Sequence, residues 1–224
     1  MKQIHDSAIV LSRIDYGERD RILTLLCREH GKRSALAKGV RSQKSRLAGG
    51  IELLSESEVG LIQGKGSLTT LTSARLKVHF ANLVTDVKRM QRAFAYLKAI
   101  GQVADEEAGQ EYYELLLVAL TSLNDLSNDI RMIDLWFNLQ LLTISGSAPS
   151  LLLEVADDAS QFEFEFDSQC FVQRNNGPFG RNDLKVLRLC ATQPRPPRLQ
   201  TALGSEDRLV TLVQAITKMN LTEL

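Results

Sequence analysis

Cysteine, histidine and long apolar runs are all scarce in this sequence, and each scarcity argues against a class of protein. The three cysteines, Cys27, Cys170 and Cys190, are odd in number and far apart, so a disulfide framework is not expected and a reducing compartment fits best. No run of about 18 apolar residues occurs, and the N-terminus lacks the apolar core of a secretory signal. We therefore expect a cytoplasmic protein without a membrane span.

Motifs of metal and nucleotide chemistry are missing as well. The three histidines, His5, His30 and His79, stand in no metal-binding spacing with cysteine or carboxylate, and neither H-E-x-x-H nor C-x-x-C occurs. The nearest approach to a phosphate-binding loop, residues 60–66, is one residue short and lacks the final Ser or Thr. We therefore predict a protein that is not an enzyme and that holds no metal and no cofactor.

One acidic cluster keeps a catalytic alternative open, because grouped carboxylates can hold Mg²⁺ in a nuclease. Within it, residues 162–166 alternate Phe and Glu, so a strand there would place its phenylalanines on one face and its glutamates on the other. The favoured interpretation is an apolar inner face and a solvated outer face. The acidic residues of the cluster are Glu154, Asp157, Asp158, Glu163, Glu165 and Asp167.

Charge is divided unevenly along the chain. Residues 1–80 hold 14 Lys or Arg against 8 Asp or Glu, a net charge of +6, whereas residues 81–224 carry −6, so the formal total is zero. A basic end suggests contact with a polyanion, although an uneven spread over solvated surfaces would give the same count.

Apolar periodicity predicts a strand-rich first part. Alternating or apolar runs predict strands at 8–12, 22–27, 34–37, 58–63 and 68–76, with a hairpin turn at Gly64-Lys65-Gly66. Roughly five strands in about 80 residues suit a small, strongly bent barrel. Pattern alone leaves an OB-fold, an SH3-like barrel and an open antiparallel sheet as alternatives.

Near residue 80 the period becomes helical. Apolar residues three or four apart predict helices at 80–105, 111–126, 130–144, 182–190 and 207–219, and Asp129 is a fair cap for the third. The helical period is lost between residues 150 and 180, where 162–166 and Phe171-Val172 predict a β-hairpin. The fold class predicted is α+β: a small β-barrel followed by an all-helical domain with an inserted β-hairpin.

The most informative feature is a stretch of cations without acids, from Lys32 to Arg46. Glycines and serines are interleaved with the cations, which lets the backbone approach phosphates and adds hydrogen-bond donors. No aromatic residue occurs there, so the stretch offers phosphate contact rather than base stacking. We predict a DNA-binding loop between strands, with a solvated cationic face as the alternative. Its cations are Lys32, Arg33, Lys38, Arg41, Lys44 and Arg46.

Several short segments of the sequence, taken in order, form a pattern typical of a known family. They are Val10-Leu11-Ser12, residues 19–25, Gly31-Lys32, Ala37-Lys38-Gly39-Val40-Arg41-Ser42, Leu47-Ala48-Gly49, Leu71-Thr72-Ser73-Ala74, Leu141-Leu142, Gly146, Pro149 and Leu151. In this order they resemble RecO, a family of bacterial DNA repair and recombination mediators. The resemblance covers most of the chain and is most specific in its N-terminal part.

The resemblance implies a fold and a role. The fold would be an N-terminal OB-fold at 1–79 and a helical domain at 80–224, with a zinc-ribbon-like insertion at 150–180. The role would be to bind single- and double-stranded DNA, to anneal complementary strands and, with RecR in the RecFOR pathway, to help RecA replace the single-strand-binding protein SSB, without catalysis. Lys38 and Arg41 would contribute to the DNA surface through the family's Ala-Lys-Gly-x-Arg segment. Such a protein would work in the cytoplasm, at the nucleoid.

The chain departs from the family at the zinc site, where many members carry four cysteines. The corresponding positions are Glu154, Asp157, Gln173 and Asn176. These residues cannot form a thiolate site, so we expect the hairpin to persist without zinc, held by Phe162, Phe164 and Phe166. The C-terminus is also short for the family, so no function is assigned to the tail.

Two other functions remain open at this point. One is a protein-interaction scaffold that does not bind DNA, and the other is a metal-dependent nuclease that uses Glu163 or Glu165. Because the SSB tail is acidic and apolar, its site would be an apolar groove with cations nearby. Candidate cations are Lys88, Arg89, Arg92, Arg131, Lys185 and Arg188.

Overall fold

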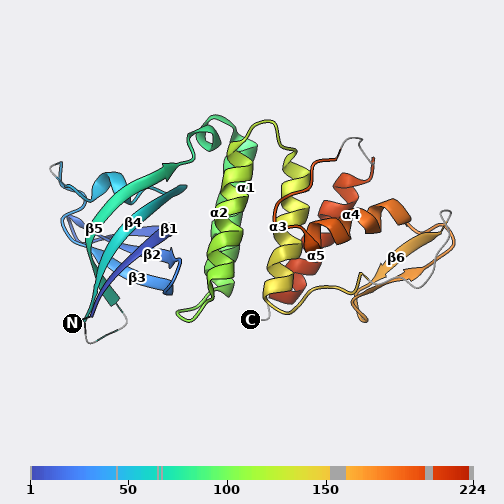
Figure 1. Cartoon of the computed structure of the whole chain (residues 1–224), viewed down its shortest axis with the longest axis horizontal. Helices are drawn as coiled ribbons and strands as arrows, with labels where there is room; N and C mark the ends of the chain where they lie inside the picture. Colours follow the sequence, from blue (N-terminus) through green and yellow to red (C-terminus); the bar gives the residue numbers. More distant parts are fainter. Residues whose placement is uncertain are drawn as a thin grey trace. The chain divides into compact units, whose positions relative to one another are not determined.

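The computed structural model describes residues 2–43, 45–64, 66, 68–151, 160–199 and 204–221. The chain divides into two compact units, residues 1–125 and 126–224. The described part of the first unit contains the strands β1 to β5 and the helices α1 and α2, and that of the second contains α3 to α5 and a small sheet (Figure 1).

The strands of the first unit form a closed barrel in the order β1-β2-β3-β5-β4. β3 and β5 pair in parallel and all other neighbours pair antiparallel. This five-stranded closed arrangement confirms the expected OB-fold. The strands are β1 (Lys2–Tyr16), β2 (Asp20–Cys27), β3 (Gly31–Ala37), β4 (Ser55–Gln63) and β5 (Leu68–His79).

All five predicted strands are present, and most are longer than their apolar runs. β1 extends from Lys2 to Tyr16 because its first half pairs with β4 and its second half with β2. The hairpin predicted between β4 and β5 is confirmed by the pairing of Gln63 with Thr69. Lys65 of its turn lies outside the described residues.

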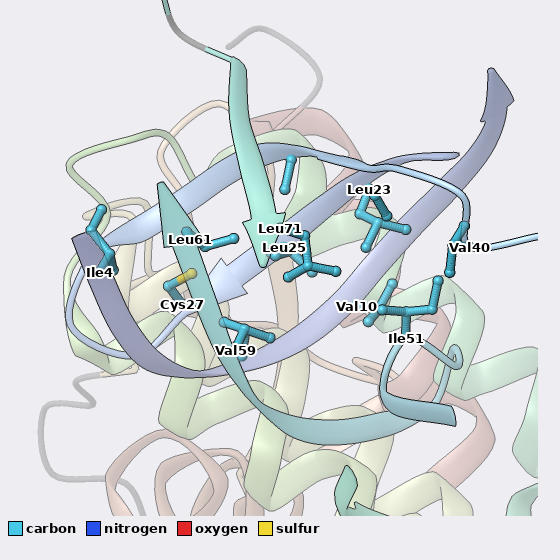
Figure 2. Close-up of a cluster of buried hydrophobic side chains, with 13 residues drawn as sticks. Ile4, Val10, Leu23, Leu25, Cys27, Val40, Ile51, Val59, Leu61 and Leu71 are labelled. Carbon is cyan, nitrogen blue, oxygen red and sulfur yellow. The ribbon is translucent and has the colours of Figure 1, made fainter. Parts of the chain in front are cut away.

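The barrel interior is filled by alternate residues of each strand. Leu23, Leu25 and Cys27 point inward from β2, and Ala35 and Ala37 from β3. Val40 and Ile51, from the connection between β3 and β4, lie beside Val10 at one end of this core (Figure 2). The connection is therefore packed onto the barrel at both of these residues.

Helices α1 (Val87–Val103) and α2 (Gln110–Asn124) belong to the same compact unit as the barrel. Tyr113 of α2 donates a hydrogen bond of 2.8 Å to Oε1 of Glu56 in β4, and the same oxygen lies 2.6 Å from Nζ of Lys77. Burial and the neighbouring Glu56 carboxylate raise the pKa of the Tyr113 hydroxyl. Gly31 (φ +62°) lets the segment after α1 approach β3, since a Cβ there would lie 2.7 Å from the carbonyl oxygen of Glu106.

The predicted change from strands to helices at residue 80 is confirmed, since β5 ends at His79 and the 3₁₀ helix η2 (Ala81–Thr85) follows. The compact units nevertheless divide after Asp125, because α1 and α2 pack with the barrel. The assignment of 1–79 and 80–224 as separate domains therefore stays a prediction.

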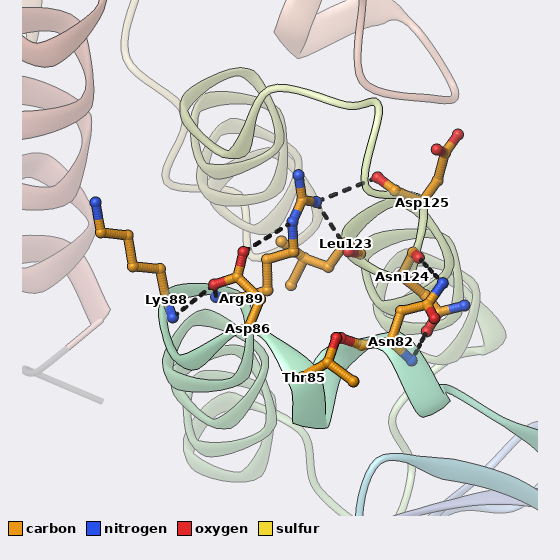
Figure 3. A network of polar contacts seen from close by, with 8 residues as sticks. All are labelled: Asn82, Thr85, Asp86, Lys88, Arg89, Leu123, Asn124 and Asp125. Carbon is orange, nitrogen blue, oxygen red and sulfur yellow. Dashed lines mark hydrogen bonds and ion pairs between the residues drawn. The ribbon is translucent and has the colours of Figure 1, made fainter.

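A buried arginine joins the start of α1 to the end of α2 (Figure 3). Nη1 of Arg89 donates to the carbonyl oxygens of Leu123 at 2.9 Å and Asp125 at 3.2 Å, which a helix leaves without intrahelical partners. Asp86 caps α1 by accepting from the amides of Lys88 and Arg89. Only 7% of the Arg89 side chain is exposed, so this cation is committed to the fold and is excluded as a partner-binding residue.

The second unit contains α3 (Ile130–Ile144), α4 (Arg181–Thr192), α5 (Glu206–Leu221) and a sheet of order β7-β6-β8. Asp129 caps α3, as expected, by accepting from the amide of Arg131. The sheet strands are β6 (Gln161–Glu165), β7 (Cys170–Gln173) and β8 (Phe179–Gly180). The predicted pairing of residues 162–166 with Phe171-Val172 is confirmed by β6 and β7, and β8 adds a strand that the sequence pattern did not predict.

The aromatic core of this sheet differs in one residue from the expectation. Phe162 and Phe164 are buried as predicted, but 42% of Phe166 is exposed because it lies just beyond the end of β6. Phe171 and Phe179 complete the core instead, with ring centroids 5.8 Å apart. Of the positions matched to the family's zinc ligands, Glu154 and Asp157 lie outside the described residues. Among the described helices, none is long and apolar enough to cross a membrane.

Replacing Arg89 by methionine should lower the free energy of unfolding by about 2–4 kcal/mol, because two buried carbonyl oxygens lose a charged donor. Urea unfolding followed by circular dichroism measures the loss, and hydrogen exchange of residues 110–124 shows where it occurs. The matched control is Lys88→Met at an exposed neighbouring position, which should stay within about 0.5 kcal/mol of the parent. Equal stability of the two variants would contradict the assigned role.

Candidate nucleic-acid interface

The connection between β3 and β4, residues 38–54, carries most of the predicted DNA-binding cations. Its first turn is fixed to the turn between β1 and β2: the amide of Arg41 donates to the carbonyl of Arg19 at 3.0 Å, and the amide of Gly39 to Oδ1 of Asp20 at 2.7 Å. Gly39 has φ +64°, a conformation that favours glycine. The two segments thus form one loop surface at one end of the barrel, which we call the loop end (residues 17–20 and 38–54).

Three of the predicted cations lie on this loop end within the described part of the chain. Lys38 and Arg46 are exposed, and neither forms an ion pair with another described residue. Arg41 is 37% exposed and reaches Oδ2 of Asp15 at 3.4 Å and the carbonyl of Gly17 at 3.4 Å. Lys44 lies outside the described residues.

Lys32 and Arg33 are placed differently, since both belong to β3 itself. Nζ of Lys32 donates to the carbonyl of Gly101 in α1 at 2.9 Å, and Nη1 of Arg33 lies 3.0 Å from Oε2 of Glu106. The Arg33 side chain is only 19% exposed. The structure therefore gives these two cations partners beside α1, away from the loop end, and their contact with DNA stays a prediction.

The sequence analysis missed two further cations, Arg19 in the loop end and Arg21 beside it in β2. Arg19 is exposed in the turn and takes part in no ion pair among the described residues. Arg21 pairs across the hairpin with Asp15, its Nε lying 2.9 Å from Oδ1. The signal that could have found them is the strand register, which places residues 15 and 21 opposite each other.

The Asp15 carboxylate forms ion pairs with both Arg21 and Arg41. The hydrogen bond from Arg21 and, to a smaller extent, the charge of Arg41 hold the pKa of Asp15 below its ordinary value. The carboxylate therefore stays ionised at neutral pH and holds both arginines in ion pairs. Arg13, which bonds Glu52 at 2.8 Å, is neutralised in a similar way.

The groups considered for catalysis have other partners. Oε1 of Glu165 lies 2.8 Å from Nη2 of Arg174, and Oε2 of Glu163 lies 3.9 Å from Nε of the same arginine. Burial raises the pKa of the Cys27 thiol to about 12, so it is packed in the barrel core as an unreactive group. Within the described residues, no group of three or more His, Cys, Asp or Glu is arranged to hold a metal ion.

The second unit contains an apolar groove of about 460 Å³ between its small sheet and α5. Phe166, Phe179 and Leu212 line it, and Arg208 stands at its border together with Asp207. Two of the cations proposed for a partner site have other partners: Arg131 bonds Asp129, and Arg188 donates to the carbonyl of Leu151 at 2.7 Å. Arg208, which the sequence analysis missed, is therefore the cation beside an apolar groove.

Comparison with known proteins gives the barrel a family. Residues 1–80 match the sequence model of the family described as "Recombination protein O N terminal". The match ends one residue after β5 and so covers the whole barrel.

Relatives extend the similarity beyond the barrel. "DNA repair protein RecO" of Desulfatibacillum aliphaticivorans is 34% identical over 154 residues, which are 67% of this chain and 60% of that protein. The protein of the same name from Heliobacterium modesticaldum is 38% identical over 153 residues, 68% of this chain and 55% of the relative. The chain thus spans between about half and three fifths of the length of these relatives. By the match of its barrel and by these identities, the chain belongs to the RecO family.

Proposed function

We propose that this protein is a DNA repair and recombination mediator that binds single- and double-stranded DNA through the loop end of its barrel. The observation that carries the proposal is the joining of two loops, which brings Arg19, Lys38 and Arg46 to one end without anionic partners among the described residues. Exposed cations on a fixed backbone neutralise phosphates and release counterions. No catalytic step is part of the proposal.

The number of cations sets the expected salt dependence. Each neutralised phosphate of duplex DNA contributes about −0.9 to the slope of log affinity against log salt concentration. The three unpaired cations alone give a slope of about −3, and all six cations of the predicted stretch would give about −5. Neutralised phosphates also repel each other less, which supports the annealing of complementary strands.

The proposed protein partners are RecR, the C-terminal tail of SSB and, indirectly, RecA. We assign the SSB tail to the groove beside Arg208, because an acidic and apolar peptide needs both an apolar floor and a cation. Phe166 and Leu212 supply the first and Arg208 the second. A role at the nucleoid in the cytoplasm follows from these partners.

The double charge reversal Lys38→Glu with Arg41→Glu should strongly weaken salt-sensitive DNA binding, because two cations of the loop end become anions. Fluorescence anisotropy with a labelled duplex and a labelled single strand should show an affinity loss of at least about tenfold at low salt. The control reverses the same charge on α1, Lys88→Glu with Lys98→Glu, both at exposed positions, and should bind within about twofold of the parent.

Unchanged binding by the loop-end variant would contradict the assigned surface. A parent slope near zero would favour the non-DNA-binding scaffold. Mg²⁺-dependent cleavage that is lost in Glu163→Gln or Glu165→Gln would favour the nuclease.

Asp15→Asn should strengthen DNA binding, because it releases Arg21 and Arg41 from their shared carboxylate. We expect roughly a threefold to tenfold gain for duplex DNA and a salt slope that is steeper by about 1 to 2. The same anisotropy titration, run at several salt concentrations, measures both. Glu29→Gln, at the β2–β3 turn, removes an equal charge away from the loop end and should leave the slope unaltered. A weaker affinity in Asp15→Asn would show that the carboxylate positions the arginines.

Arg208→Glu should weaken binding of a peptide with the C-terminal sequence of SSB by about tenfold, because an acidic peptide would meet a second anion beside Asp207. Anisotropy of the labelled peptide measures the effect, and DNA affinity should not change. Arg195→Glu, at an exposed position outside the groove, is the control. Equal peptide affinity in both variants would place the tail elsewhere.

A further inference from the structure

On the outer face of β1, β2 and β3, the half next to the loop end is uncovered. Ile14 of β1 pairs with Ile22 of β2, and Ile22 pairs with Leu36 of β3. All three side chains point away from the core. Tyr16 follows Ile14 on the same side of β1, next to the loop end. Ile14 is 65% exposed and Tyr16 is 54% exposed.

The other half of the same face is covered by α1. Ile9 and Leu26 pair with each other on this outer side, and both are fully buried. Lys32, which pairs with Leu26, donates from Nζ to the carbonyl of Gly101 in α1. The exposure of Ile14 and Tyr16 is therefore specific to the half near the loop end, and it leaves two large apolar side chains in solvent.

The uncovered half is apolar and hydroxyl-rich, and cations border it. Ser12 donates to Oγ1 of Thr24 at 2.9 Å between the apolar positions. Asp20, which pairs with Tyr16, already accepts from the amide of Gly39. Arg19 follows the Tyr16 end of the hairpin, and Lys38 directly follows β3.

A largely apolar face beside cations suits a single-stranded nucleic acid. A single strand can lay its bases on an aromatic and aliphatic surface while its phosphates meet the bordering cations. A duplex keeps its bases stacked inside and offers the same surface only sugars and phosphates. A protein partner would gain nothing specific from the cations unless it were acidic, so the combination favours a nucleic-acid strand.

We propose that this outer face is a base-stacking platform for single strands, with Tyr16 stacking on a base and Ile14 and Leu36 supporting its neighbours. The inference rests on the proposed DNA-binding function and adds a second contact to it. The loop-end cations bind phosphates of either form of DNA, and the platform distinguishes single strands from duplexes. Tyr16 is thereby a residue that determines specificity rather than general affinity.

The test compares Tyr16→Ala, Tyr16→Phe and the parent protein on an oligothymidine of about 15 nucleotides and on a duplex of the same length. Tyr16→Ala should lose about 5- to 100-fold in affinity for the single strand, should bind the duplex within about twofold, and should keep the parent salt slope. Tyr16→Phe should retain single-strand affinity, because the ring is kept. Phe94→Ala, which removes another exposed aromatic side chain from α1, should change neither affinity.

Tyr16→Trp gives a direct readout. Its indole fluorescence should be quenched when oligothymidine binds and should change little with duplex, while Trp136 is buried and contributes a constant background. Single-strand affinity unchanged in Tyr16→Ala, or equal losses for both DNA forms, would overturn the platform. If the Lys38 and Arg41 reversal loses DNA binding while Tyr16→Ala has no effect on affinity, the proposed DNA-binding function is supported and the platform is not. If the parent protein shows no salt-sensitive DNA binding, both the proposed function and the platform are contradicted.

Discussion

The double pairing of β1 is the constraint on which the first unit depends. Because this strand is 15 residues long, it can pair with β4 along its first half and with β2 along its second half, and so close the barrel. Closure leaves no exposed sheet edge. It also sets the positions of both loops that carry the candidate interface, since one follows the end of β1 and the other follows β3. The positions of the proposed DNA-binding loops therefore follow from the strand pairing of the barrel.

Fixing a loop to a barrel lowers the conformational entropy that binding must overcome. Val40 and Ile51 pack into the core, and the backbone of Arg41 is bonded to that of Arg19. The described cations Lys38, Arg41 and Arg19 are thus held on a backbone fixed by these contacts, as the proposed DNA binding requires. Asp15 works in the opposite direction, because it occupies Arg21 and Arg41 while DNA is absent. If DNA binds at this end as proposed, its affinity would depend on the balance between the unpaired cations and those that must first leave a carboxylate.

Sequence reasoning predicted the strands, the helices and the change between them, because those depend on local apolar periodicity. The same reasoning failed for side chains whose contacts come from residues far away in the sequence. Val87 and Phe94 fit the helical spacing of α1 yet are 64% and 41% exposed, while Arg89 is buried through contacts with residues 34 and 36 positions away. Lys32 and Arg33 belong to the cationic stretch in sequence, but β3 carries them to α1. Arg19 and Arg21 were missed because they approach the cationic stretch only in the fold, Arg19 through its backbone bond to Arg41 and Arg21 through the hairpin register with Asp15.

A register shift in β1 determines which side chains lie on each side of the β1–β2 hairpin. Before it, Ala8 and Val10 point into the barrel; the register shifts between Val10 and Ser12, and beyond it Arg13 pairs with inward-facing Leu23. Without the extra residue, Ile14 and Tyr16 would turn toward the barrel mouth, and Arg13 and Asp15 would turn to the outer face. The bulge therefore separates an ionic surface at the mouth from an apolar surface outside. The proposed phosphate contacts and the proposed base contact would then lie on adjacent surfaces of one hairpin.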